Sequence, residues 1–150
     1  MGGVLTCAAF HAQTGHFAPQ PAFLSLPAVI TVGCILLVNN TSDLEKDHAG
    51  GRRTLSVCIG RRASRILLRT SVILAASGVI AILLLRFPGG WAAAAVLSGW
   101  LLCGNGFRIL LVSPVLPAQR RENMTAILNV HKWIIGCYTA GILLDAFLLL

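Results

Sequence analysis

Apolar residues in this chain fall into long runs, and polar residues gather in the short stretches between them. The long runs occupy residues 22–40, 66–85, 91–111 and 133–150. Each is close to the roughly 20 residues that a helix needs to cross a bilayer. A shorter apolar run opens the chain. The pattern predicts an all-α integral membrane protein with about four transmembrane helices and a partial N-terminal one, in a single domain over residues 1–150.

Composition supports a membrane protein and excludes a soluble globular one. The chain is 56% hydrophobic and 11% charged, with a mean hydropathy of +0.80. A soluble protein of this length would have too few polar side chains to cover its surface. We therefore expect the lipid bilayer to surround most of the chain.

Positive charge is concentrated after the first span, in residues 41–65, which we call the motif loop. If this loop is cytoplasmic, eleven of the twelve bases lie on the cytoplasmic side and only Arg86 lies outside. Such a bias sets the orientation of membrane helices, so we predict a multi-pass protein of the inner (plasma) membrane. The net charge of +7 does not indicate nucleic-acid binding, because the bases flank spans and no aromatic residues interleave with them.

Three of the five acids in the chain, Asp43, Glu45 and Asp47, lie within five residues of the motif loop. If the helix continues past the first span, the four-residue spacing puts Asp43 and Asp47 on one face. Two carboxylates form half of a Mg²⁺ site, which water and substrate phosphates usually complete. A diphosphate therefore fits as the bridging ligand.

Basic and amide side chains flank this acidic pair. Arg52 and Arg53 are candidates for phosphate oxygens, since a guanidinium donates paired hydrogen bonds, and the glycines before them allow the chain to turn back. The pair alone would also fit a solvated helix end whose acids bind Lys46 and the arginines. Asn39 and Asn40 favour a binding site, because polar side chains at membrane depth usually face a cavity.

The run Asn39-Asn40-x-x-Asp43-x-x-x-Asp47-x-x-x-Gly51-Arg52-x-Thr54-Leu55, followed by Val57 and Gly60, resembles a known motif. It is similar to the second aspartate-rich motif of the UbiA superfamily of intramembrane aromatic prenyltransferases. The most similar branch acts on 1,4-dihydroxy-2-naphthoate, and its motif reads approximately N-N-x-R-D-x-x-x-D-x-x-x-G-K-x-T-L. Ser42 and Arg52 stand where that motif has Arg and Lys.

This resemblance implies the C-terminal half of a nine-helix membrane bundle and a prenyltransferase activity. It implies transfer of a polyprenyl group from polyprenyl diphosphate to 1,4-dihydroxy-2-naphthoate with decarboxylation, giving demethylmenaquinone. Asp43 and Asp47 would be the catalytic residues and the ligands of the Mg²⁺ cofactor. The residues implied at the diphosphate are Asn39, Asn40, Lys46, Arg52 and Arg53.

The family's first aspartate-rich motif has no counterpart, because the only acids outside the motif loop are Glu122 and Asp145. We therefore expect the chain alone to be incomplete as a catalyst and a separate N-terminal half to be a further partner. The alternative is a non-catalytic small membrane protein that binds anionic lipid or a partner through its basic loop. The neutralisation of Asp43 and Asp47 distinguishes the two, since only the enzyme requires both carboxylates.

Overall fold

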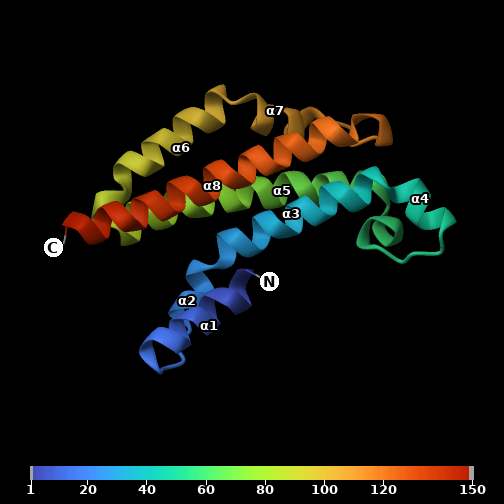
Figure 1. The fold of residues 1–150 in the computed structure, drawn as a ribbon. Helices are drawn as coiled ribbons and strands as arrows, with labels where there is room; N and C mark the ends of the chain where they lie inside the picture. Colours follow the sequence, from blue (N-terminus) through green and yellow to red (C-terminus); the bar gives the residue numbers. More distant parts are fainter. Residues whose placement is uncertain (1, 149–150) are drawn as a thin grey trace.

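The structure, a computed structural model, describes residues 2–148, and every regular element in that range is helical (Figure 1). In chain order the elements are α1 (Gly2–Thr14), α2 (Gln20–Leu24), α3 (Leu26–Ser42), α4 (Leu44–Ala49), α5 (Leu55–Arg86), the 3-10 turn η1 (Pro88–Gly90), α6 (Trp91–Cys103), α7 (Asn105–Val112), the 3-10 turn η2 (Pro117–Gln119) and α8 (Arg120–Leu148). The prediction of an all-α protein is confirmed.

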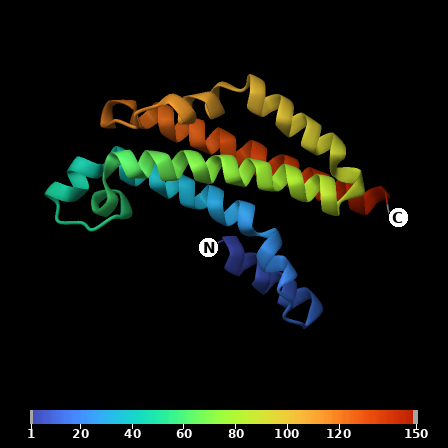
Figure 2. The same ribbon diagram turned by 180° about the vertical axis from the view of Figure 1, so that it is seen from behind.

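The centre of the fold is a three-helix bundle of α3, α5 and α8. Helix α3 runs antiparallel to α8, because Asn39 bonds to Arg120 at the start of α8 and Thr31 bonds to His131 further along, both at 2.8 Å. Figures 1 and 2 show α5 alongside both helices, with α6 and α7 packed against α8. The fully buried apolar side chains of the bundle are Val38, Leu68, Val72, Val79, Leu83, Ile127, Val130 and Ile134.

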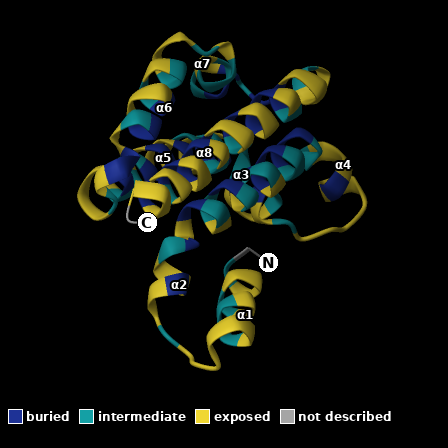
Figure 3. Ribbon diagram, turned by 60° about the vertical axis from the view of Figure 1, so that its left-hand side comes forward, coloured by how far each residue is buried: buried dark blue, intermediate teal, exposed yellow. Residues whose placement is uncertain are grey.

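Large apolar side chains also cover the outside of the bundle. Figure 3 shows exposed residues along the outer faces of the helices, and Leu85 and Leu102 are 86% and 88% exposed. A soluble monomer rarely exposes so much apolar surface. Lipid tails are as apolar as leucine side chains, so this surface fits a protein that lies in a bilayer.

Among the described residues, two helical segments are each long and apolar enough to span a membrane, Leu55–Arg86 and Pro117–Leu148. A third span is possible if α6 and α7, which are bent by 55° relative to each other, count as one. Helix α3 is apolar but has only 17 residues. Of the four predicted spans, two are therefore continuous long helices, one is broken and one is short.

The helix bounds differ from the predicted spans where charged residues continue a helix. Helix α5 begins at Leu55 rather than at residue 66 and is interrupted at Gly60, and α8 begins at Arg120 rather than at 133. The motif loop itself contains α4. Arginine, lysine and glutamate are good helix formers, so the helices extend past the apolar runs. The last two residues of the predicted span 133–150 lie outside the described residues.

Two predicted spans also contain breaks. The first, 22–40, is divided at Ser25, with Pro27 near the start of α3. Proline is tolerated there because the N–H groups of a helix's first turn have no intrahelical acceptor. The third, 91–111, breaks at Gly104, where ψ is 123° and the backbone leaves the helical region.

The carboxylate of Asp145 holds the turn between α5 and α6. Asp145 is 8% exposed, and its Oδ1 accepts a hydrogen bond of 2.8 Å from the buried backbone N–H of Gly89.

We predict that Asp145→Ala lowers the free energy of unfolding by about 1–3 kcal/mol, because it leaves a buried donor unpaired. Thermal unfolding in detergent measures this. Asp145→Asn is the matched control, since it keeps an acceptor oxygen, and equal loss in both variants would contradict the assignment.

Candidate functional site

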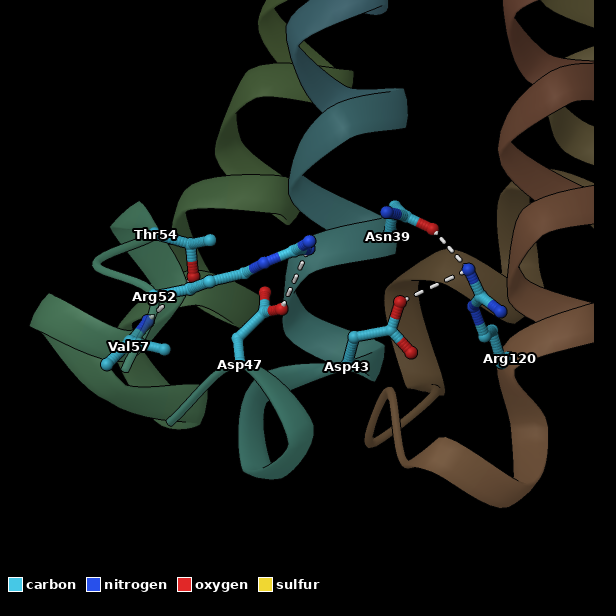
Figure 4. Close-up of polar contacts among 7 residues, drawn as sticks. All are labelled: Asn39, Asp43, Asp47, Arg52, Thr54, Val57 and Arg120. Carbon is cyan, nitrogen blue, oxygen red and sulfur yellow. Dashed lines mark hydrogen bonds and ion pairs between the residues drawn. The ribbon is translucent and has the colours of Figure 1, made fainter. Parts of the chain in front are cut away.

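The acidic motif lies where α3 passes into α4. Asp43 falls between the two helices, with φ −96° and ψ 13°, yet helical hydrogen bonds continue through it. The N–H of Asp43 donates to the carbonyl of Asn39 at 3.0 Å, and the N–H of Asp47 donates to the carbonyl of Asp43 at 2.8 Å. Asn39, Asp43 and Asp47 therefore lie on consecutive turns (Figure 4).

A tight turn after α4 brings Arg52 back to Asp47. Gly51 has a φ of +69°, a left-handed conformation that glycine adopts without steric cost. The backbone N–H of Arg52 then donates to the carbonyl of Asp47 at 2.9 Å, and its guanidinium lies 3.7 Å from the Asp47 carboxylate. The Asp47 side chain is only 8% exposed, whereas that of Arg52 is 78% exposed.

A second arginine approaches the motif from a different helix. The Nη2 of Arg120 lies 3.1 Å from the carboxylate of Asp43 and donates to the side-chain oxygen of Asn39 at 2.8 Å. Figure 4 shows the Asp43 side chain directed towards Arg120 and the Asp47 side chain directed towards Arg52. Sequence reasoning counted Arg120 only among the bases that set the membrane orientation, because nothing in the sequence places α8 beside α3.

The third acid of the motif braces α4 against α5. Glu45 binds the Nη2 of Arg61 at 2.5 Å, while the Nη1 of Arg61 donates to the carbonyl of Val115 in the connection before α8. The hydrogen bond from Arg61 lowers the pKa of the Glu45 carboxyl below its usual value. Because Glu45 is bound away from the other two acids, we assign it a structural role.

The remaining predicted site residues are near the acidic pair but are not tied to it. Asn40 is half-buried, and Lys46 and Arg53 are exposed. Among the described residues, no side-chain hydrogen bond or ion pair joins these three to the motif. The motif residue Thr54 is the N-cap of α5, since its hydroxyl accepts a hydrogen bond from the N–H of Val57 at 3.4 Å. Thr54 therefore fixes the start of a helix.

The donor set of the motif fits Mg²⁺ as a partial site. Within residues 2–148, no group of three or more acidic, histidine or cysteine side chains converges on one point. Asp43 and Asp47 nevertheless offer oxygen ligands on adjacent turns, and Mg²⁺ is usually held by one or two carboxylates with waters and phosphate oxygens. Asp43 and Asp47 could therefore hold the ion only with water or substrate.

Comparison with known proteins agrees with the motif. The sequence matches the UbiA prenyltransferase family over residues 1–144. It is 34% identical over 98 residues to the 1,4-dihydroxy-2-naphthoate octaprenyltransferase of Bacillus subtilis (strain 168). The aligned region covers 65% of this chain and 32% of that protein. The chain therefore spans about a third of the length of this relative. No solved structure matches it.

Two animal proteins are similar over a shorter region. The chain is 36% identical over 66 residues, 44% of its length, to the UbiA prenyltransferase domain-containing protein 1 homolog of Drosophila melanogaster. It has the same identity over the same length with UbiA prenyltransferase domain-containing protein 1 of Rattus norvegicus. These alignments cover 18% and 20% of the two relatives. With the family match over nearly the whole sequence, they show that this chain belongs to the UbiA prenyltransferase family.

Proposed function

We propose that this chain binds the diphosphate end of a polyprenyl diphosphate, together with Mg²⁺, in a prenyl transfer reaction. The observation that carries the proposal is the pair of carboxylates, Asp43 and Asp47, on consecutive turns with an arginine beside each. Such an arrangement combines oxygen ligands for a hard cation with guanidinium donors for phosphate. A basic loop that only attracts anionic lipid would need the arginines but not the acids.

The acceptor that we propose is 1,4-dihydroxy-2-naphthoate, and the proposal rests on similarity to the 1,4-dihydroxy-2-naphthoate octaprenyltransferase of Bacillus subtilis. The bond between the prenyl carbon and the diphosphate oxygen breaks, with the electron pair leaving on the diphosphate. A carbon of the aromatic ring then bonds to the allylic carbon, and the ring loses its carboxyl group as carbon dioxide. No electrons leave the ring in these steps, so the immediate product would be the hydroquinone form of demethylmenaquinone, and a separate two-electron oxidation would give the quinone.

Each residue of the motif has a defined part in this proposal. Asp43 and Asp47 would hold the metal, which would neutralise charge on the diphosphate when bound. Asn39 and Asn40 would contact the diphosphate. Arg52 donates to phosphate oxygens, with Lys46 and Arg53 close enough in the chain to add positive charge. A separate N-terminal half, with the first aspartate-rich motif, would complete the metal ligands.

The charge distribution supports a cytoplasmic position for the site, in the inner (plasma) membrane. Contacts of α8 with α3, and of Arg61 with Val115, bring the basic parts of the chain to one end of the bundle. Arg86 follows at the far end of α5, near the turn held by Asp145. Cytoplasmic ends of membrane proteins collect lysine and arginine, so we propose that the acidic motif faces the cytoplasm.

Binding of a polyprenyl diphosphate with and without Mg²⁺ tests the proposed function. The whole chain is placed in nanodiscs of neutral phosphatidylcholine, and binding of the labelled lipid is measured in Mg²⁺ or in EDTA. We expect Mg²⁺ to tighten binding by at least about tenfold, because charge-assisted contacts to the diphosphate require the ion. The matching polyprenyl alcohol is the control and should show no dependence. Equal dependence for both lipids, or none for either, would contradict the proposal.

A further inference from the structure

Arg120 holds the carboxylate of Asp43 in a contact that a metal ion would have to displace. A single nitrogen of its guanidinium contacts both the Asp43 carboxylate, at 3.1 Å, and the Asn39 oxygen, at 2.8 Å. Both partners are residues of the proposed site. A guanidinium and a divalent cation compete for the same carboxylate oxygens because both are attracted by its charge. Arg120 therefore occupies the position from which it can control access to Asp43.

The side chain of Arg120 is half-exposed and lies at the start of a helix. It is 51% exposed, and it is the first residue of α8, directly after the 3-10 turn η2. Exposed ion pairs of this kind contribute little to stability, roughly 0–1 kcal/mol. Breaking the ion pair between Arg120 and Asp43 therefore costs little free energy when a ligand provides another acceptor for the guanidinium. A phosphate group is such an acceptor, since arginine donates two parallel hydrogen bonds to it.

The sequence next to Asp43 offers no other guanidinium on that side. Ser42 stands where the resembling motif has an arginine, and its side chain is fully buried with no hydrogen-bond partner among the described residues. The arginine beside the first acid comes instead from α8. Figure 4 shows Arg120 on the opposite side of Asp43 from Arg52, so the two guanidiniums flank the acidic pair.

We propose that Arg120 is a substrate-binding residue that pairs with Asp43 before ligands bind and donates to the diphosphate once a metal occupies Asp43. The inference rests on the proposed function. It predicts opposite effects of one substitution on two ligands. Removal of the guanidinium frees Asp43 for the metal, so metal binding tightens, and it removes a donor to phosphate, so diphosphate binding weakens. An arginine that only joined α8 to α3 would not produce opposite effects.

The test uses the whole chain in neutral nanodiscs, as wild type, Arg120→Gln, Arg120→Lys and Arg121→Gln. Arg121 is the matched control, because it is an exposed arginine on the same turn and, within the described part of the chain, no hydrogen bond or ion pair joins its side chain to the motif residues. Free Mn²⁺ is followed by electron paramagnetic resonance without phosphate. Binding of inorganic pyrophosphate is measured separately in saturating Mg²⁺.

We expect Arg120→Gln to bind Mn²⁺ about threefold more tightly, as the loss of an exposed ion pair allows. We expect it to bind pyrophosphate about tenfold more weakly, as the loss of a charged hydrogen-bond donor requires. Arg120→Lys should retain part of the pyrophosphate affinity, and Arg121→Gln should match the wild type. If wild type binds both ligands and Arg120→Gln changes neither or weakens both, the inference is overturned. If wild type binds neither ligand, the proposed function itself fails, and the inference with it.

Discussion

Replacing Asp47 with asparagine is expected to weaken Mg²⁺-dependent binding of polyprenyl diphosphate by about 10- to 100-fold, the loss that removal of one charge-assisted contact causes. The amide keeps the shape of the side chain but loses its negative charge, and a neutral oxygen is a weaker ligand for Mg²⁺. Asp43→Asn should have an effect of the same order. Equilibrium binding to the chain in neutral nanodiscs measures both.

The matched control for these variants is Glu122→Gln. Glu122 is an exposed acid in the first turn of α8, at the same end of the bundle but outside the motif. Its substitution removes the same charge from the chain, and we expect diphosphate binding to change less than about twofold, within what a distant surface substitution causes. Equal tightening in all three variants would mean that net charge, and not a metal site, governs binding of the anionic diphosphate. That result would favour the lipid-binding alternative.

Replacing Gly60 with alanine is expected to lower the free energy of unfolding by about 1–3 kcal/mol, the cost of an L side chain in a region that glycine alone populates. Gly60 has a φ of 78° and a ψ of 163° and interrupts α5 one residue before Arg61. The break directs Arg61 towards Glu45 and the carbonyl of Val115. Thermal unfolding measures the loss, and increased proteolysis within the motif loop should accompany it.

Gly78 in the same helix provides the control. It has helical geometry, and a Cβ built on it meets no atom within 4 Å. Alanine favours a helix over glycine by up to about 1 kcal/mol, so Gly78→Ala should leave stability unchanged or raise it. If Gly60→Ala and Gly78→Ala unfold at the same temperature, the break at Gly60 has no energetic role and the brace through Arg61 does not depend on it.

The sequence predicted the membrane helices because their lengths and apolar runs follow from the thickness of the bilayer. It did not predict their ends, since hydropathy does not distinguish a charged loop from a charged helical turn. The start of α5 at Leu55 and the start of α8 at Arg120 are both in charged segments. The break at Gly104 was also missed, because the run was assigned from its hydropathy alone, although Gly104-Asn105-Gly106 is a local turn signal.

The candidate site was predictable only where its residues are neighbours in sequence. The spacing of Asp43 and Asp47 predicted two carboxylates on one helix face. The backbone hydrogen bonds place the two residues on consecutive turns, with the Asp43 side chain directed towards Arg120 and the Asp47 side chain towards Arg52. Arg120 lies 81 positions from Asn39, and only the packing of α8 on α3 brings the two together. The role of Asp145 depends in the same way on a distant partner, the backbone of Gly89. Single-sequence patterns describe local geometry and not such contacts.

The central claim is that Asp43 and Asp47 together make a metal-dependent diphosphate site. The most direct test is a Mg²⁺ titration of polyprenyl diphosphate binding, with the wild-type chain and the Asp43→Asn/Asp47→Asn double variant compared in the same neutral nanodiscs. We predict that wild type binds more tightly as Mg²⁺ rises and that the double variant shows no dependence. The same Mg²⁺ dependence in both proteins would contradict the claim.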